Sequence, residues 1–328
     1  MHDEISSATL PLVSVLVRSM DRVTLDRTLD SVAAQEYPNI EVVVAAACGP
    51  AHRDLPSACG RFPLRLIRTN RPLQRAEAAN SALDAARGEL LNLLDDDDTF
   101  LPHHVSSLHS AMANSEGARL SHARSLSVGE SAHGPSEFGA RFKPWRQLDS
   151  FFFHSQAALF ARSLVLEGAR FDPQFEILED HDFFVQCAQL TRFVYLERVT
   201  CVSYRDSGTS GTGTQLDSAR INRTVGQLRS KWSMLERRLH ATPEFRLEQA
   251  MWHLDHGEVN VALNQVRDIL VERPDWPDAL ALAALLAERS GDIDMAKSKL
   301  EQLGHRKLDE DALQARINIL GEWLKSRK

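Results

Sequence analysis

The sequence predicts an α/β protein, with a mostly parallel Rossmann-like sheet in the first two-thirds and an all-helical repeat domain in the rest. Three observations predict this architecture. Short apolar runs alternate with helical patterns up to Tyr204, four consecutive aspartates follow one of those runs, and a 34-residue repeat occupies the C-terminal part.

The composition is typical of a globular chain of about two domains. The chain has 328 residues, of which 43% are hydrophobic and 25% are charged. A net charge of −7 gives no general attraction to nucleic acid, so no nucleic-acid partner is expected. The four cysteines, Cys48, Cys59, Cys187 and Cys201, lack the spacing of a disulfide framework or a metal site, which favours reduced thiols.

The sequence also bears on location. No apolar run reaches the roughly 18 residues of a membrane-spanning helix, so no transmembrane segment is expected. The residues before the first apolar run include Asp3 and Glu4, whereas a secretory signal begins with basic residues. We therefore expect a cytoplasmic protein, and peripheral contact with the inner face of the membrane stays open.

The first hundred residues alternate predicted strands and helices. The helices are indicated by apolar residues at steps of three and four or by alanine-rich composition, and Gly88 is a typical helix stop. This alternation favours a parallel sheet with helices on its faces. The predicted strands are Leu12–Val17, Ile40–Ala47, Leu64–Ile67 and Leu90–Leu94, and the predicted helices are Leu25–Gln35 and Arg75–Ala86.

The following hundred residues are less regular. Ser121–Lys143 is rich in Ser, Gly and His without periodicity, and either a mobile active-site loop or a surface insertion explains it. Strands are predicted at Ala157–Ala161, Phe193–Leu196 and Val199–Tyr204, and Ser207–Gly213 reads as a flexible polar segment.

A basic amphipathic helix is predicted over residues 217–240. Ile221, Val225, Leu228 and Trp232 form part of one apolar stripe, and the other faces carry arginines and a lysine. Such a helix can lie on an anionic membrane, or it can connect two domains and pack on its neighbours. We favour the connecting helix and assign it residues 216–241.

The C-terminal part contains an internal repeat. Gly257 and Gly291 are 34 residues apart, as are Ala262 and Ala296. A period of this length, with Gly at a helix–helix turn and Ala five residues later, resembles the tetratricopeptide repeat. The small residues allow two antiparallel helices to approach closely. A generic helical bundle is the alternative interpretation.

The aspartate run Asp95–Asp98 is the strongest chemical signal, because it follows a predicted buried strand directly. Adjacent carboxylates repel one another unless a cation binds. Hard divalent cations such as Mg²⁺ take oxygen ligands, commonly one or two carboxylates together with substrate phosphates. A solvated acidic turn is the alternative for the run taken alone.

Several blocks of the chain, in order, resemble glycosyltransferase family 2, which has the GT-A fold. The resemblance covers about residues 10–206. The order and spacing of the blocks make it more specific than any single motif. The blocks are LVSVLVRSMD from Leu12, SVAAQEYPNIEVVV from Ser31, NRPLQRAEAANSALDAARGELLNLLDDDD from Asn70 and FDPQFEILEDHDFFVQCAQ from Phe171.

The resemblance implies a donor site. The family's Asp-x-Asp motif falls on Asp95-Asp96-Asp97. Asp97, helped by Asp95, would bind Mg²⁺ or Mn²⁺, which holds the diphosphate of a nucleotide-sugar donor. Asp95 and Asp96 would also lie near the sugar nucleotide, and Arg75 matches an arginine that faces the nucleotide.

The resemblance also implies an acceptor site. The family's acidic pair falls on Glu179-Asp180, and both would be catalytic residues. Asp180 would be the general base that deprotonates the acceptor hydroxyl, with inversion at the anomeric carbon. His154 and His181 lie near this side in the sequence, and a structural role is favoured for each. Trp145 and Phe151–Phe153 form either a sugar-stacking wall or part of the core, and the core is favoured.

The chain departs from the family pattern at three places. The usual aspartate pair after the second strand is replaced by the segment around Ala46, so base recognition must come from other groups. The segment after the first strand begins with Arg18, which we include with Ala46 among the nucleotide-sugar-binding residues. Asp206 stands near the place where many members have a metal-binding histidine, and it would serve as an oxygen ligand.

We therefore predict a GT-A domain over residues 1–215 and a tetratricopeptide-like domain over 242–328. The predicted activity is an inverting, metal-dependent, hexosyltransferase-type transfer to a glycan, lipid-linked or protein acceptor, as in polysaccharide biosynthesis. The repeats would bind the acceptor, a protein partner or a second copy of the chain. A catalytically weak binding scaffold is the main alternative, and a nucleotidyltransferase is a weaker one.

Overall fold

The computed structural model describes residues 10–129, 134–205 and 218–325. The chain divides into two compact units, Met1–Lys231 and Trp232–Lys328. The first unit is built on a sheet and the second is helical. Each unit is described by itself.

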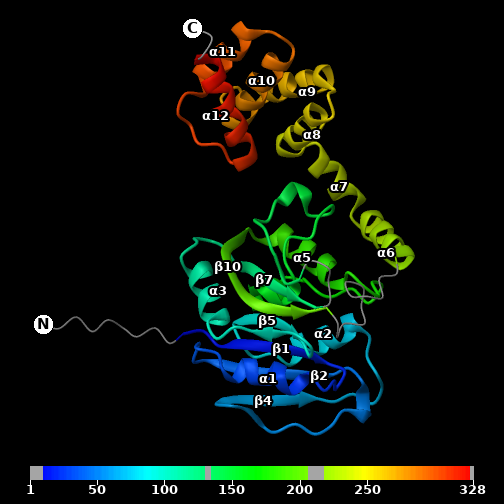
Figure 1. Ribbon diagram of the computed structural model, residues 1–328. Coiled ribbons are helices and arrows are strands. Elements are labelled where there is room, and N and C mark those ends of the chain that lie inside the picture. The colour runs from blue at the N-terminus through cyan, green and yellow to red at the C-terminus, as the bar shows by residue number, and fades with distance from the viewer. Residues whose placement is uncertain (1–9, 130–133, 206–217, 326–328) are drawn as a thin grey trace, which may run out of the picture. The chain divides into compact units, whose positions relative to one another are not determined.

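A ten-stranded sheet forms the centre of the first unit (Figure 1). Its strand order is β3-β4-β2-β1-β5-β9-β7-β10-β6, and β8 pairs with β7. All pairs among β4, β2, β1 and β5 are parallel, whereas β9 runs antiparallel to both of its neighbours, β5 and β7. The strands are β1 (Val13–Ser19), β2 (Ile40–Ala46), β3 (Ala58–Cys59), β4 (Phe62–Ile67), β5 (Leu90–Asp95), β6 (Thr99–Phe100), β7 (Leu120–Val128), β8 (Ser136–Phe138), β9 (Ala158–Ala161) and β10 (Phe193–Tyr204).

Helices cover both faces of this sheet. The helices of the unit are α1 (Leu25–Ala33), α2 (Arg75–Ala85), α3 (His104–Ala113), α4 (Arg162–Leu166), α5 (Glu179–Leu190) and α6 (Ser218–Lys231). Apolar residues of α1 and α3 share a core with Val13, Val15 and Val17 of β1, and residues of α2 and α5 share a second core with Leu16. Every residue of β1 and β2 is buried, as expected for central strands covered on both sides.

The four strands and two helices predicted before residue 95 are all present, and their ends lie within two residues of the predicted ends. The alanine-rich helix α2 packs its small side chains, Ala76, Ala78, Ala79 and Ala82, into the core beneath it. Small side chains bring the helix backbone close to the sheet, which explains its composition.

The segment predicted as a loop or insertion was interpreted wrongly. Within Ser121–Lys143 the chain forms most of the central strand β7 and the short strand β8. Polar residues of β7 are buried: Ser121 Oγ donates to the Leu108 carbonyl at 2.8 Å, and the His122 ring stacks on Phe153. A strand that buries satisfied hydroxyls does not look apolar in the sequence.

Two further predictions need correction. The two strands predicted around residues 193–204 are one strand, β10, with irregular pairing between Leu196 and Cys201. The single helix predicted over 217–240 is two helices, α6 and α7 (Ser233–His240), with a break at Trp232. The predicted polar segment Ser207–Gly213 lies outside the described residues.

Helix α6 joins its own unit through ion pairs. Arg220 Nη2 lies 2.7 Å from Glu176, and Lys231 Nζ lies 2.7 Å from Asp172 and 2.8 Å from Asp182. Thr224 and Leu228 are buried. These contacts agree with a helix that packs on its neighbours, whereas contact with a membrane stays a prediction.

The second unit is all-helical and periodic. It contains α7, α8 (Pro243–Asp255), α9 (Val259–Glu272), α10 (Pro277–Arg289), α11 (Ile293–Leu303) and α12 (Asp311–Lys325). Gly257 and Gly291, with φ of 78° and 83°, stand in the α8–α9 and α10–α11 turns, where glycine adopts the left-handed backbone without strain. Ala262 and Ala296 are fully buried at equivalent positions. The 34-residue period thus corresponds to two successive helix pairs, and a tetratricopeptide-like assignment stays a prediction.

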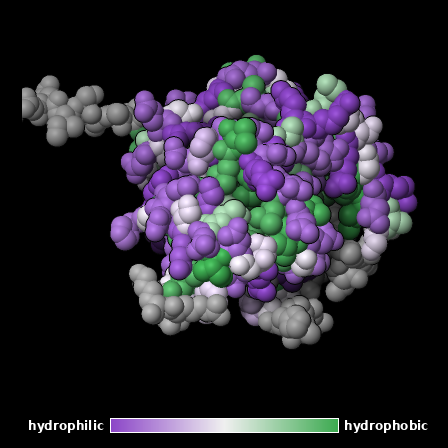
Figure 2. Space-filling model, turned by 90° about the horizontal axis from the view of Figure 1, so that it is seen from above, coloured by the Kyte–Doolittle hydropathy of each residue, from purple (hydrophilic) through white to green (hydrophobic). Residues whose placement is uncertain are grey.

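Helix α10 is the centre of this second core. Its residues from Asp278 to Ala287 are all buried, and they pack with side chains of α9, α11 and α12. Large apolar side chains also reach the surface of the unit, among them Trp252, Val271 and Ile319. On the face drawn in Figure 2, hydrophobic groups lie between more numerous hydrophilic ones. Self-association through the repeats stays a prediction.

The described residues contain no helix that is long and apolar enough to cross a membrane.

The close approach of Gly88 to β1 gives a stability prediction. A Cβ at Gly88 would stand 2.6 Å from the Ser14 nitrogen and 2.7 Å from the Leu12 oxygen, and neither backbone atom can move freely. We expect Gly88→Ala to lower the free energy of unfolding by about 1–3 kcal/mol. Urea unfolding of the full chain, followed by circular dichroism, measures this loss.

Gly226→Ala is the matched control, because a Cβ at this position inside helix α6 would meet nothing within 4 Å. This substitution should stabilise the chain by about 0.5–1 kcal/mol. Equal effects of the two substitutions would contradict the packing described for Gly88.

Candidate active site

The carboxyl ends of β1 and β5 bring the first two parts of the site together. In the parallel β1–β5 pair, Arg18 lies opposite Asp95. Ligands of open α/β sheets gather at this edge. The register of two buried strands therefore fixes an arginine beside the first residue of the aspartate run.

Arg18 joins the aspartate run to the second acidic segment. Its guanidinium binds both oxygens of Asp95, at 2.7 and 2.9 Å, and its Nη1 lies 2.6 Å from Glu179 Oε1. Arg75, the first residue of α2, also binds Glu179 at 2.8 Å and lies 3.7 Å from Asp95. Segments far apart in sequence thus meet at one site through two shared arginines.

The two arginines determine the charge state of these carboxylates. Burial opposes ionisation, but the charges of Arg18 and Arg75 outweigh it and lower the pKa of Asp95. At Glu179, burial likewise opposes ionisation, and Arg75 and Arg18 outweigh it and lower the pKa. Glu179 is 1% exposed, so it is a fixed, ionised group of the interior.

Asp180 has the opposite behaviour. Burial and the negative charge of Glu179 raise the pKa of Asp180, although Arg75 and Arg18 partly offset them. It accepts a hydrogen bond from the His181 backbone nitrogen at 2.9 Å. The residue before the pair, Leu178, has a φ of 62°, a left-handed conformation that is rare for leucine and that starts helix α5. Asp180 is therefore a stronger base than an ordinary aspartate.

The three later residues of the aspartate run differ in their partners. Asp96 is fully buried; it accepts a hydrogen bond from the Met20 nitrogen at 2.6 Å and forms an ion pair with Arg22. Asp98 accepts hydrogen bonds from Gln156 Nε2 at 2.7 Å and from the Tyr204 nitrogen at 3.0 Å. Both side chains hold neighbouring loops in place.

Asp97 is the carboxylate of the run with the weakest pairing. Its Oδ2 lies 3.9 Å from Arg22 Nη1, and 7% of the residue is exposed. Burial and the charge of Asp95 raise its pKa, and Arg22 offsets them only in part. The pKa of Asp98 is raised well above its usual range by burial, Asp95 and Asp97. The turn thus carries negative charge that the arginines do not fully neutralise.

Side chains in and before α1 hold the backbone of this turn. Thr24 Oγ1 donates to the Asp96 carbonyl at 2.7 Å, and Thr28 Oγ1 donates to the Asp98 carbonyl at 2.8 Å. Arg27 Nη2 donates to the Asp97 carbonyl at 3.0 Å. These residues and Arg22 were not predicted as site residues, since only the strand register shows that α1 faces the turn.

The donor set fits a divalent cation such as Mg²⁺ or Mn²⁺. It offers hard carboxylate oxygens with excess negative charge. Among the described residues, no three His, Cys, Asp or Glu ligand atoms of this turn lie within 4.8 Å of one another. An incomplete protein shell is what a cation that also binds phosphates and water requires. Asp206, the third predicted ligand, lies outside the described residues.

The other predicted donor-site residues differ in access. Arg75 keeps 33% of its side chain exposed, whereas Arg18 is 6% exposed and bound by two carboxylates. Ala46 is fully buried at the end of β2, opposite Ser19. Arg75 can therefore reach a ligand directly, Arg18 acts through its carboxylate partners, and the Ala46 side chain offers no surface.

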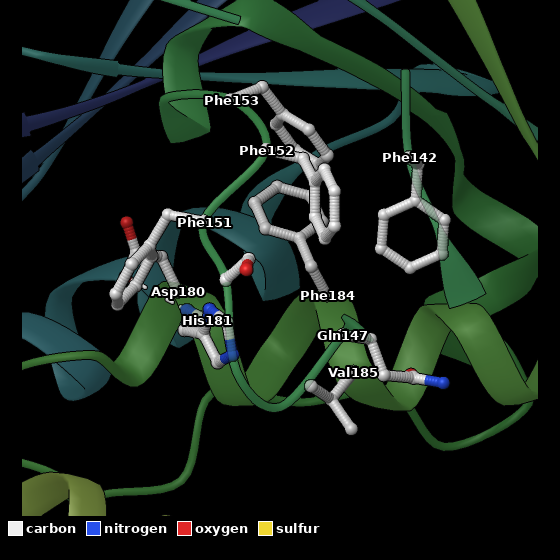
Figure 3. Close-up of a pocket in the computed structure, with 10 residues that line it drawn as sticks. Phe142, Gln147, Phe151, Phe152, Phe153, Asp180, His181, Phe184 and Val185 are labelled. Carbon is white, nitrogen blue, oxygen red and sulfur yellow. Dashed lines mark hydrogen bonds between the residues drawn. The ribbon is translucent and has the colours of Figure 1, made fainter. Parts of the chain in front are cut away.

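A pocket adjoins the start of α5 (Figure 3). It is enclosed by the segment from Phe142 to Phe153 and by helix α5. Asp180 and His181 stand among phenylalanine side chains in its wall. The lining residues are Phe142, Gln147, Ser150, Phe151, Phe152, Phe153, Asp180, His181, Phe184 and Val185.

Residues 14–169 match the family model described as Glycosyl transferase family 2. This part of the chain is thus similar to glycosyltransferase family 2. The resemblance noted from the sequence is thereby confirmed for this part of the chain. The matched residues include Arg18, Arg75 and the whole aspartate run, whereas Glu179 and Asp180 lie beyond them.

Curated relatives are distant. The chain is 26% identical over 219 residues to the uncharacterized protein y4gI of Sinorhizobium fredii. The aligned residues make up 64% of this chain and 24% of that protein. It is 24% identical to the uncharacterized glycosyltransferase MJ1057 of Methanocaldococcus jannaschii, over 37% of this chain and 43% of that one. The chain therefore spans less than half the length of these two relatives.

Solved structures support the fold. TarS 1–349 of S. aureus in complex with UDP-GlcNAc matches with a TM-score of 0.53 and 16% identity, over 92% of this chain and 95% of that one. The mannosyltransferase PcManGT of Pyrobaculum calidifontis, in complex with GDP-Man and Mn²⁺, matches with a TM-score of 0.51 and 19% identity, over 90% and 86%. At these identities the likeness concerns the fold, and it confirms the predicted GT-A-like α/β architecture.

The double pairing of Arg18 gives a stability prediction with a defined pH dependence. Arg18→Met leaves Asp95 and Glu179 buried with less compensation, so we expect a loss of about 3–5 kcal/mol in unfolding free energy at neutral pH. The lowered pKa of Glu179 stabilises the native chain above the usual glutamate value of 4.5, and this contribution disappears as pH falls further. The difference between wild type and variant should therefore shrink below that pH, as measured by denaturant unfolding across pH.

Arg71→Met is the control, since the Arg71–Glu77 pair has an arginine side chain that is 60% exposed. It should cost far less than Arg18→Met. A loss for Arg18→Met that is the same at every pH would contradict the electrostatic account.

Proposed function

We propose that the chain transfers a hexose from a nucleotide-sugar donor to an acceptor hydroxyl, with inversion at the anomeric carbon and with a divalent cation. One observation carries the proposal: the aspartate run and the Glu179–Asp180 pair meet at the carboxyl edge of the sheet through Arg18 and Arg75. The similarity to family 2 and the donor complexes of TarS and PcManGT support it.

On the donor side, Asp97 and Asp95 would hold Mg²⁺ or Mn²⁺, and Asp206 would be a further ligand. A bound cation supplies Lewis-acid neutralisation of the charge that develops on the leaving nucleoside diphosphate. Asp95 is oriented for this role by Arg18, which binds both of its oxygens. Arg75 keeps an exposed guanidinium on the same side and would face the nucleotide.

On the acceptor side, Asp180 would take the proton of the attacking hydroxyl. Burial and the charge of Glu179 raise its pKa, which makes it a better proton acceptor than an ordinary aspartate. Glu179 is fixed by two arginines, so we assign it a positioning role for Arg18 and Arg75. A single displacement, with base and leaving group on opposite sides of the sugar, gives inversion.

A binding scaffold with weak or no turnover is the second candidate. It is favoured by the end of β2, where Ala45 and Ala46 replace the acidic residues expected in the family and are fully buried. The nucleotide base must then be bound by other groups. In either case the helical unit would bind the acceptor, a protein partner or a second copy, in a cytoplasmic setting with peripheral membrane contact left open.

Two substitutions test the assigned roles. Asp97→Asn should weaken Mn²⁺-dependent binding of UDP or GDP, because it removes a negative ligand. Asp180→Asn should keep nucleotide binding and lower turnover by about 10²–10⁴-fold, because it removes the base. A panel of UDP- and GDP-sugars with Mn²⁺, measured by calorimetry for binding and by nucleotide release for turnover, separates the two effects.

Asp54→Asn is the control, since the Asp54 side chain is fully exposed and distant in sequence from the site. It should change neither binding nor turnover. Unchanged turnover in both Asp97→Asn and Asp180→Asn would refute the role assignment. Metal-dependent nucleotide binding without turnover on any donor would favour the scaffold.

A further inference from the structure

The pocket beside Asp180 has a lining that is mostly apolar and rich in phenylalanine. It has an empty volume of about 360 Å³, part of which is open to solvent. Five of its ten lining residues are phenylalanines, and Val185 is a further apolar residue of the lining. Figure 3 shows the rings of Phe152, Phe153 and Phe184 grouped together, with Phe142 facing them and Phe151 beside Asp180 and His181.

The aromatic wall is partly open. Phe151 is 51% exposed, although burial of a phenylalanine side chain is favourable by about 1.5–3 kcal/mol. Its ring meets the His181 ring edge to face, with centroids 4.5 Å apart. Phe153 and Phe184 are themselves packed together, with centroids 4.9 Å apart. The sequence left two roles open for these phenylalanines, a place in the core or in a ligand-binding wall. Phe153 packs against the core, whereas Phe151 presents apolar surface next to the proposed base.

The pocket has few hydrogen-bonding groups to offer. The Gln147 amide is already used, since its Nε2 donates to the Pro144 carbonyl at 2.8 Å and its Oε1 accepts from Gln189 at 3.1 Å. The Nε2 atom of His181 is buried and has no hydrogen-bond partner among the residues that the structure describes. Burial lowers the pKa of His181 to about 4, so the ring is neutral at pH 7. Whichever tautomer it adopts, Nε2 can bind one hydroxyl group, as donor or acceptor.

We propose that the acceptor carries an apolar group, an aromatic ring or an acyl chain, which fills the phenylalanine pocket and places the reacting hydroxyl between Asp180 and His181. This inference rests on the proposed function and specifies its acceptor. Asp180 would receive the proton of this hydroxyl as its oxygen attacks the anomeric carbon, and the nucleoside diphosphate leaves from the opposite side.

An unsubstituted glycan fits the pocket less well. Each sugar ring brings several hydroxyl groups, and a buried hydroxyl without a partner costs about 1–3 kcal/mol. Besides Asp180 and His181, the lining offers the Ser150 hydroxyl and otherwise the faces and edges of phenylalanine rings. An apolar group gains free energy from the same surfaces. The lining offers much apolar surface and few hydrogen-bonding groups. It therefore favours an acceptor whose apolar part lies next to a single reacting hydroxyl.

Two glycosides that differ only in the aglycone test the proposal. Phenyl β-glucoside and methyl β-glucoside are titrated into the full chain in the presence of UDP and Mn²⁺, with saturation-transfer NMR to identify the bound protons. We expect the phenyl glycoside to bind about tenfold or more tightly than the methyl glycoside, with the strongest transfer to its ring protons. Phe151→Ala should remove most of this difference.

Leu166→Ala is the matched control, because Leu166 is 75% exposed in helix α4 and is not part of the pocket. It should keep the full preference for the phenyl glycoside, and thermal unfolding by circular dichroism checks that both variants fold. Equal binding of the two glycosides, or an unchanged preference in Phe151→Ala, would overturn the pocket assignment. Failure of the wild-type chain to bind either UDP or GDP with Mn²⁺ in parallel titrations would instead refute the proposed function, and the acceptor role with it.

Discussion

A buried arginine between two carboxylates is the interaction on which the site depends. Arg18 ends a central strand, and its guanidinium has one edge on Asp95 and another nitrogen on Glu179. Since all three groups are largely withdrawn from water, each is tolerated only because the others are present. The position of helix α5 relative to the end of β5 is thus fixed by charge as well as by apolar packing.

Four identical residues in one turn have different properties because their surroundings differ. Asp95 is ionised by two arginines, Asp96 is buried as the anchor of the loop after β1, Asp98 is held by Gln156 and the Tyr204 backbone, and Asp97 is buried 3.9 Å from Arg22. The repulsion among the four carboxylates is therefore offset to a different extent at each of them. Asp97 has the weakest pairing of the four, whereas the Asp95 side chain, at 26%, is the more exposed.

The strands and helices around these groups could largely be predicted, because continuous apolar runs and three-to-four spacing record burial directly. The strand β7 could not, since Ser121, His122 and Ser125 are polar residues that are buried; the two serines bond to α3 and to His154, and the His122 ring stacks on Phe153. The motifs located Asp95–Asp97 and Glu179–Asp180, but Arg22, Thr24 and Thr28 carry no local signal. Their role arises from the packing of α1 beneath the turn, which is a tertiary contact.

The direction of one strand explains how the aromatic segment reaches the acidic groups. Strand β9 runs against β5 and β7, so its beginning, and not its end, lies at the edge where Asp95 stands. The residues that lead into β9 therefore arrive at that edge, and Gln156 contacts Asp98 there. At this carboxyl edge, a parallel strand contributes only the loop that follows it in the sequence. A single reversed strand adds an incoming loop, which can change its length and its side chains without altering any strand that holds the charged groups.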